Sequence, residues 1–255
     1  MDSTKVTRNQ RKKNADPLLP TSVKSESGRC GACGRLILLL IPILACAFVL
    51  AALFLLANLP GVHITETTIS DCLAAYESKG EILALVSVGA TLMAVSSIMR
   101  NIQINVYHRR QKSESIATKV LNFIAAMSNI FAYVGFIILF TFDVDGPDAV
   151  ERLHIVGATM YFALGGLYAL LHMYLLCKQT QYPMFFKIIF AMFAFAIIAS
   201  SIIFYLKPTE LCVFEWFAVA LDAIYVGLMG ILFIVDPVDD ELRSFFCCRD
   251  GQRKK

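Results

Sequence analysis

The sequence predicts an all-α polytopic membrane protein, a six-transmembrane-helix bundle with both termini cytosolic. Three observations support this fold class: six long apolar stretches, a composition with 57% hydrophobic and 17% charged residues, and lysine and arginine gathered in alternate connections. A hydrocarbon core about 30 Å thick needs roughly 20 helical residues at about 1.5 Å each. Because lipid offers the backbone no hydrogen-bond partner, we expect each stretch to be a helix.

The expected spans follow one another along the chain with short connections. Five are long enough to cross the bilayer with apolar residues alone. The second is shorter and reaches the required length only if polar residues at its end are included. In chain order the spans are residues 36–58, 82–98, 120–142, 154–177, 186–206 and 216–235. They form one membrane domain, residues 36–235, between a disordered basic N-terminal tail (1–35) and a C-terminal tail (236–255).

The distribution of positive charge predicts the orientation. Of the 23 Lys and Arg residues, 20 fall in the two tails and in the connections after the second and fourth spans. Because cytosolic segments are enriched in these residues, we expect both tails in the cytosol and the more acidic loops outside. Three cations in one cytosolic loop are candidates for contact with anionic phospholipid or cytosolic protein partners: Arg109, Arg110 and Lys112. We expect membrane lipid, and no nucleic acid, as a partner.

The cysteines divide by the side of the membrane on which they are expected. Cys72 and Cys212 fall in exterior loops, where an oxidising compartment permits a disulfide, so we predict that they pair; two free thiols are the alternative. Four others lie next to the spans on the cytosolic side and are palmitoylation candidates: Cys30, Cys33, Cys247 and Cys248. No modification, or a metal site built by both tails, are the alternatives for these four.

Polar residues inside the spans need partners in the bilayer. Asp222 is the one acid within the expected spans, and a carboxylate at such depth costs about 2.5 to 3.5 kcal/mol on insertion scales. It is therefore a candidate functional residue. The structural alternative is that it stays protonated or hydrogen-bonds to a neighbouring helix such as the third span, where Asn122 and Asn129 lie on one face. His172 shares a stripe of the fourth span with tyrosines and glycines that suits a lipid headgroup or acyl chain.

Enzyme and metal motifs are missing from the chain. No phosphate-binding loop, dinucleotide fingerprint, nucleophile elbow or paired-histidine zinc motif occurs. The histidines of the fourth span, His154 and His172, would be about 27 Å apart on a helix and cannot share an ion. We therefore expect no metal, no cofactor and no catalytic residue.

Short motifs recur at defined places relative to the spans. Ile-Ser-Asp precedes the second span, and a His-x-x-Gly element opens the fourth. A glycine and a tyrosine occupy the middle of the fourth span, and Glu-Trp opens the sixth. In chain order the residues of these motifs are Ile69, Ser70, Asp71, His154, Gly157, Gly165, Tyr168, Glu215 and Trp216. In these motifs and their order the chain resembles the damage-regulated autophagy modulator (DRAM) and transmembrane protein 150 family. That superfamily also contains CWH43-like N-terminal domains.

The resemblance implies a small six-helix protein of lysosomal, endosomal or plasma membranes. One branch of the family modulates autophagy, another helps to recruit a phosphatidylinositol 4-kinase complex, and a distant branch takes part in remodelling the lipid of GPI anchors. The leading hypothesis is a non-enzymatic regulator of the autophagy/lysosome or phosphoinositide-membrane type that anchors partners through cytosolic basic segments. The alternative is a component of GPI-anchor lipid remodelling at the exterior leaflet, with Asp71, His154, Glu215 and Asp222 as polar groups. Scarce intramembrane charge disfavours a transporter.

Overall fold

Helices make up most of the described chain, and the six expected spans are confirmed. The structure, a computed structural model, describes residues 27–75, 79–111, 115–142, 147–206 and 211–235, and within these ranges it contains no strand. The elements are α1 (Ser27–Ala57), α2 (Ile69–Ala75), α3 (Lys79–Arg110), α4 (Ile116–Thr141), α5 (Asp148–Thr159), the π-helical η1 (Met160–Leu164), α6 (Gly165–Lys178), α7 (Met184–Leu206) and α8 (Val213–Val235).

The spans extend beyond the apolar stretches that predicted them. Six helices are long and apolar enough to cross a membrane, and α5, η1 and α6 together make the fourth. The second, α3, continues to Arg110, well past the predicted end at Ile98, and α8 begins at Val213, before the predicted Trp216. The helix α1 begins at Ser27, inside the stretch that the sequence analysis assigns to the N-terminal tail. Residues 1–26 and 236–255 lie outside the described residues.

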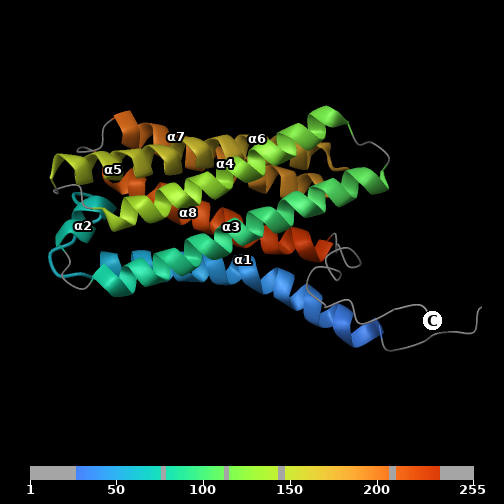
Figure 1. Cartoon of the computed structure of the whole chain (residues 1–255), viewed down its shortest axis with the longest axis horizontal. Coiled ribbons are helices and arrows are strands. Elements are labelled where there is room, and N and C mark those ends of the chain that lie inside the picture. Colours follow the sequence, from blue (N-terminus) through green and yellow to red (C-terminus); the bar gives the residue numbers. More distant parts are fainter. Residues whose placement is uncertain (1–26, 76–78, 112–114, 143–146, 207–210, 236–255) are drawn as a thin grey trace, which may run out of the picture.

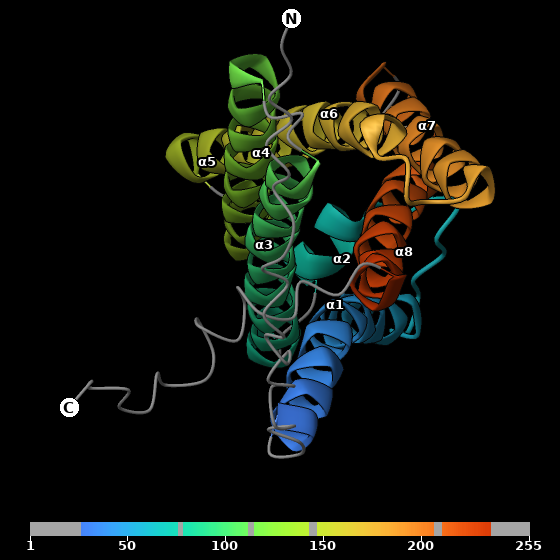
Figure 2. The same cartoon turned by 90° about the vertical axis from the view of Figure 1, so that its right-hand side faces the viewer.

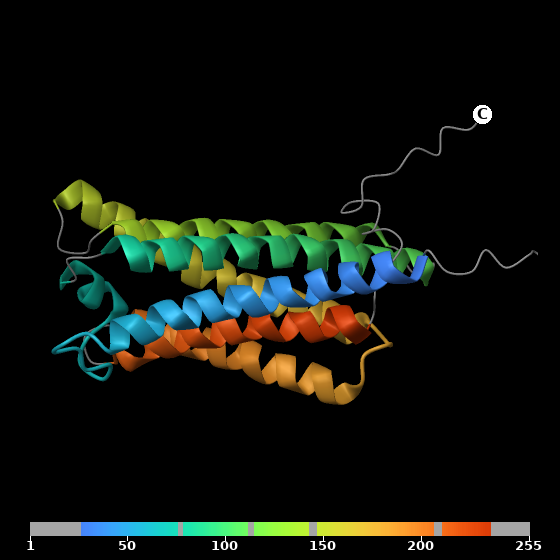
Figure 3. The same ribbon diagram turned by 90° about the horizontal axis from the view of Figure 1, so that it is seen from below.

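The six spans close into a ring. Helix α1 packs against α3 and α8, α3 packs against α4, α4 against the α5–η1–α6 span, and α6 and α8 both pack against α7. Figure 2 shows this ring from one end, with the short α2 across its far opening. In Figures 1 and 3 the start of α1 and the end of α8 lie at the opposite end from α2. We call these the tail end and the α2 end.

Two glycines let α4 and α5 touch near the α2 end. A Cβ atom on Gly135 would lie 2.7 Å from the carbonyl oxygen of Gly157, and one on Gly157 would lie 2.7 Å from the backbone nitrogen of Leu139. Side chains at either position would therefore push the backbones apart. Directly after this contact the fourth span widens into the π-helical η1, and such π-turns re-aim the side chains that follow.

Candidate functional site

The first turn of α8 holds α2 against the bundle. Glu215 is 1% exposed, and its Oε2 accepts a hydrogen bond from the backbone N–H of Ile69 at 2.7 Å while Oε1 lies 3.2 Å from the Ser70 hydroxyl. The indole N–H of the neighbouring Trp216 donates to the Thr67 carbonyl at 2.9 Å. One carboxylate and one indole thus fix a short helix that starts far away in the sequence.

His154 joins this contact from the fourth span. Its Nε2 lies 3.1 Å from Ser70 Oγ, and its Nδ1 lies 2.7 Å from the carbonyl oxygen of Phe142. A carbonyl only accepts, so Nδ1 carries a hydrogen and donates it. The Ser70 hydroxyl thus lies between His154 and Glu215, and the three side chains form one buried network.

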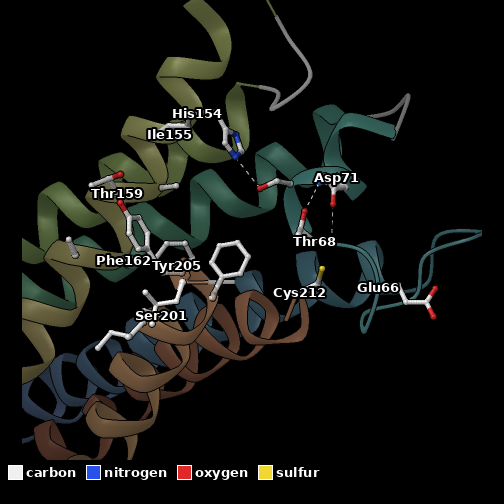
Figure 4. A pocket seen from close by; sticks show the side chains of 16 residues that line it. Glu66, Thr68, Asp71, His154, Ile155, Thr159, Phe162, Ser201, Tyr205 and Cys212 are labelled. Atoms are coloured by element: carbon white, nitrogen blue, oxygen red, sulfur yellow. Dashed lines mark hydrogen bonds between the residues drawn. The ribbon is translucent and has the colours of Figure 1, made fainter. Parts of the chain in front are cut away.

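A large cavity opens beside this network, and we call it the α2 groove. It has a volume of about 930 Å³ and lies between the α5–η1 part of the fourth span and α7, with α2 and the segment before it at one end. Polar groups line that end, among them Thr68, Asp71 and His154, as Figure 4 shows. The walls along the spans are apolar and aromatic: Ile155, Ala158, Phe162, Ile202, Phe204 and Leu206.

The π-turn of the fourth span points successive residues to different places. Phe162 lines the α2 groove, whereas its neighbour Tyr161 is 4% exposed and donates from its hydroxyl to Asp222 Oδ2 at 3.1 Å. Asp222 therefore finds its partner on the fourth span. Both Tyr161 and Asp222 line a smaller cavity that also shares Phe162 and Ser201 with the α2 groove. The carboxyl group lies directly behind the groove wall.

Asp222 hydrogen-bonds to a neighbouring helix, as one reading of the sequence expected, but that helix is the fourth span and not the third. Asn122 donates to the backbone oxygen of Asn101 and to the side chain of Asn105, both at 2.9 Å, and Asn129 donates to the Ser97 hydroxyl. Both asparagines of α4 therefore tie that helix to α3. Sequence periodicity placed them on one face correctly but could not tell which neighbouring helix that face meets.

A second polar cluster, which the sequence analysis missed, surrounds Arg100 inside the bundle. Arg100 is 1% exposed, and its guanidinium donates to His172 Nε2 at 3.0 Å, to Gln179 Oε1 at 2.9 Å, to Tyr182 Oη at 3.2 Å and to Gln103 Oε1. Arg100 had been assigned to a cytosolic loop because the second span was ended at Ile98. The polar stretch after that residue hid the continuation of the helix.

His172 takes a defined role from this cluster. Because guanidinium only donates, His172 Nε2 must accept, so the hydrogen sits on Nδ1 and is directed to the Tyr225 hydroxyl at 2.6 Å. The ring stacks on Tyr168, with centroids 5.5 Å apart. His172, Tyr168 and Tyr225 are all buried, so this stripe of the fourth span packs inside the bundle.

The family-motif residues separate into two groups. Ile69, Ser70, His154, Glu215 and Trp216 meet in the network at the α2 end, with Asp71 on the groove. Gly157 makes the close contact with α4, while Gly165 and Tyr168 lie deeper along the fourth span. His154 and His172 belong to different clusters, and no three His, Cys, Asp or Glu side chains within the described ranges lie close enough together to hold a metal ion.

Cys72 and Cys212 lie at the α2 end, both at most 2% exposed. Burial raises the pKa of Cys72 to about 11, assisted by the negative charges of Asp71 and Glu215. Burial also raises the pKa of Cys212, and the same two carboxylates contribute, which places both thiols in one acidic neighbourhood. Cys72 is a thiol in the structure, so the disulfide stays a prediction.

We expect mass spectrometry of unreduced protein to find a peptide that links Cys72 to Cys212. Alkylation must be done after denaturation, because a buried thiol with a raised pKa reacts slowly and would mimic a disulfide in the folded protein. The exposed Cys177 is the internal control for complete alkylation. Alkylation of both residues without reductant would contradict the pairing.

The remaining predicted contact and modification residues lie at the tail end or outside the described residues. Arg109 and Arg110 end α3 and are exposed, while Lys112, Cys247 and Cys248 lie outside the described residues. Cys30 and Cys33 fall in the first turns of α1. Nothing tests their acylation, and it stays a prediction.

Comparison with known proteins gives one family match. The family model described as Frag1/DRAM/Sfk1/Cwh43P N-terminal domain matches residues 34–233, nearly the whole of the described bundle. The searches of curated proteins and of solved structures give no match. The family match confirms the resemblance that the short motifs indicated.

Proposed function

Since the chain belongs to the Frag1/DRAM/Sfk1/Cwh43P N-terminal domain family, we propose that it is a non-enzymatic membrane regulator that binds a lipid in the α2 groove. It is an integral membrane protein whose six apolar helices contact lipid. The proposal joins this anchoring role to one defined binding site. Its finer form, a role in autophagy at lysosomes or at phosphoinositide-rich membranes, comes from the family resemblance.

The α2 groove is the observation that carries the proposal. Its volume of about 930 Å³ is at the upper end of the roughly 300 to 1,000 Å³ typical of ligand sites. Polar residues gather at one end and apolar residues along the spans, which matches a molecule with a headgroup and chains. Three wall residues remain open to the surroundings: Ile155 is 52% exposed, Ile202 53% and Leu206 71%. A lipid can therefore enter sideways from the bilayer.

The charge distribution supports a second contact with the membrane at the tail end. Arg109 and Arg110 end α3 there, next to the connection that carries Lys112. Each basic residue near an anionic leaflet contributes about 1 kcal/mol of attraction. In this proposal, that end meets anionic phospholipid or protein partners in the cytosol, while the α2 groove faces the opposite leaflet.

Filling the groove is expected to displace the lipid. Ala163 lines the groove, and its replacement by phenylalanine places a ring where chains would lie. We expect native mass spectrometry of the Ala163→Phe variant to show at least a tenfold loss of co-purified lipid, about 1.4 kcal/mol of binding free energy. Ala51→Phe, at an exposed position of α1, is the matched control and should keep the lipid. Equal lipid in both variants would refute a groove-bound ligand.

The Ser70–His154 contact favours a second candidate, lipid-ester chemistry of the GPI-remodelling type. A serine hydroxyl 3.1 Å from a histidine nitrogen, with the other ring nitrogen bound to a carbonyl, is the arrangement of an activated nucleophile. In this candidate Ser70 Oγ bonds to an ester carbonyl carbon and His154 passes the hydroxyl proton to the departing alcohol oxygen. Water then cleaves the acyl-serine to release a fatty acid.

Cells that lack the protein distinguish the two candidates. In the enzymatic case, Ser70→Ala and His154→Ala each fail to restore GPI-lipid composition, whereas His63→Ala, at an exposed loop histidine, restores it. In the regulatory case all three variants that fold leave that composition unchanged. Monodisperse behaviour in detergent checks folding first, because Ser70 also bonds to Glu215.

A further inference from the structure

We propose that the α2 groove selects a zwitterionic phospholipid whose headgroup ends in an ammonium group. This inference rests on the proposed lipid-binding function and adds the chemical class of the lipid. It follows from the hydrogen-bonding capacity left open at the polar end, from the aromatic rings beside it, and from the sign of the charge around the groove.

The polar end of the groove contains hydrogen-bond acceptors that a ligand can use. Both ring nitrogens of His154 are engaged, with Phe142 and Ser70. Asp71 uses one oxygen, Oδ2, to accept from the Thr68 N–H at 3.2 Å, and Thr68 Oγ1 accepts from the Asp71 N–H at 3.0 Å. The second oxygen of Asp71 has no partner among the described residues, nor has the exposed Glu66 carboxylate at the outer rim. A ligand group that donates hydrogen bonds can complete these carboxylate oxygens, which only accept.

Aromatic rings continue the site from the carboxylates toward the spans. Phe162 and Phe204 line the groove with ring centroids 5.7 Å apart, and Tyr205 lies beside them with 75% of its surface exposed. Figure 4 shows Phe162 and Tyr205 next to each other between the fourth span and α7. Ring faces attract cations through their quadrupole, most strongly where the cation is desolvated. The combination suits an ammonium group.

The charge around the groove disfavours an anionic headgroup. Glu66 and Asp71 line its polar end, and no Lys or Arg of the described chain lines it. An anionic lipid would bring a like charge toward two carboxylates without a compensating cation, whereas the ammonium of a zwitterionic lipid faces them favourably. The tail end has the opposite character, with Arg109 and Arg110 at the end of α3. The two ends are therefore expected to prefer different headgroups.

Photo-crosslinking of two lipids with identical chains tests the selection. The purified full-length chain in detergent receives a trace of either phosphatidylethanolamine or phosphatidylglycerol that carries a diazirine in one acyl chain. We expect phosphatidylethanolamine to label peptides of α5, η1 and α7 about tenfold more than phosphatidylglycerol, the ratio that corresponds to about 1.4 kcal/mol. Equal labelling, or preference for phosphatidylglycerol, would overturn the selection.

Two variants connect the preference to the rim carboxylates. The double variant Glu66→Gln with Asp71→Asn removes both charges and keeps an oxygen that can accept from Thr68. We expect its preference to fall to within about twofold while total labelling by phosphatidylglycerol is kept or increased. Glu151→Gln, at an exposed acid of α5 that does not line the groove, should keep the tenfold ratio. An unchanged ratio in the double variant would overturn the assignment to Glu66 and Asp71.

Failure of the selection is separable from failure of lipid binding. If both lipids label the groove equally and Ala163→Phe abolishes both labels, the groove binds lipid without the proposed headgroup preference. If neither lipid labels α5, η1 or α7, the lipid-binding function itself is refuted.

Discussion

Replacing Glu215 with alanine is expected to detach α2 and to lower the stability of the folded protein by about 3 kcal/mol. The substitution leaves the buried N–H of Ile69 without its acceptor and removes one partner of Ser70, and each unsatisfied buried group costs about 1 to 3 kcal/mol. Because α2 carries residues of the groove, the same variant should lose the bound lipid. The loss of stability is measured as the midpoint of thermal unfolding in detergent. The signal is the disappearance of the monodisperse peak on heating.

Two further variants make this prediction specific. Glu215→Gln keeps one oxygen that can accept from Ile69 but replaces the other, which accepts from Ser70, by an amide nitrogen that only donates, so its midpoint should fall between wild type and Glu215→Ala. Glu151→Ala, at an exposed acid of α5 near the same end, should leave the midpoint unchanged. If Glu215→Ala unfolds at the wild-type temperature, the carboxylate does not hold α2.

Hydropathy predicted the spans because a bilayer demands long apolar helices, and that demand is visible in composition alone. It failed at the ends of two spans for one physical reason. Polar residues that are satisfied inside the bundle look like loop residues in a sequence. The predicted boundaries leave Glu215 outside the sixth span and Arg100 outside the second, yet each is 1% exposed and hydrogen-bonded to several protein groups.

The candidate site was predictable in its residue types but not in its geometry. Ser70, His154 and Glu215 were singled out by the family resemblance, and three different segments bring them within hydrogen-bond distance. Helix α2 was missed because Ile69–Ala75 is too short to show a helical period. The groove was missed because it depends on the π-turn at Met160–Leu164, which rotates Phe162 toward α7 and leaves Tyr161 for Asp222.

Replacing Arg100 with methionine is expected to destabilise the protein by about 3 kcal/mol or more and to loosen the connection between α6 and α7. Methionine keeps much of the volume but leaves His172, Gln179 and Tyr182 without the donor that joins them. Each buried acceptor that is left without its donor costs about 1 to 3 kcal/mol. The midpoint of thermal unfolding and the rate of tryptic cleavage after the exposed Lys178 measure the two effects.

The partners of Arg100 explain why lysine cannot replace it. Guanidinium donates from three nitrogens to groups on α3, α6 and the following connection, whereas an ammonium directs three hydrogens from one point. Arg100→Lys should therefore keep the charge and still lose stability. Arg152→Met, the same substitution at an exposed position of α5, should unfold at the wild-type temperature. Wild-type stability and wild-type cleavage in Arg100→Met would show that this buried cation is not needed to close the tail end of the bundle.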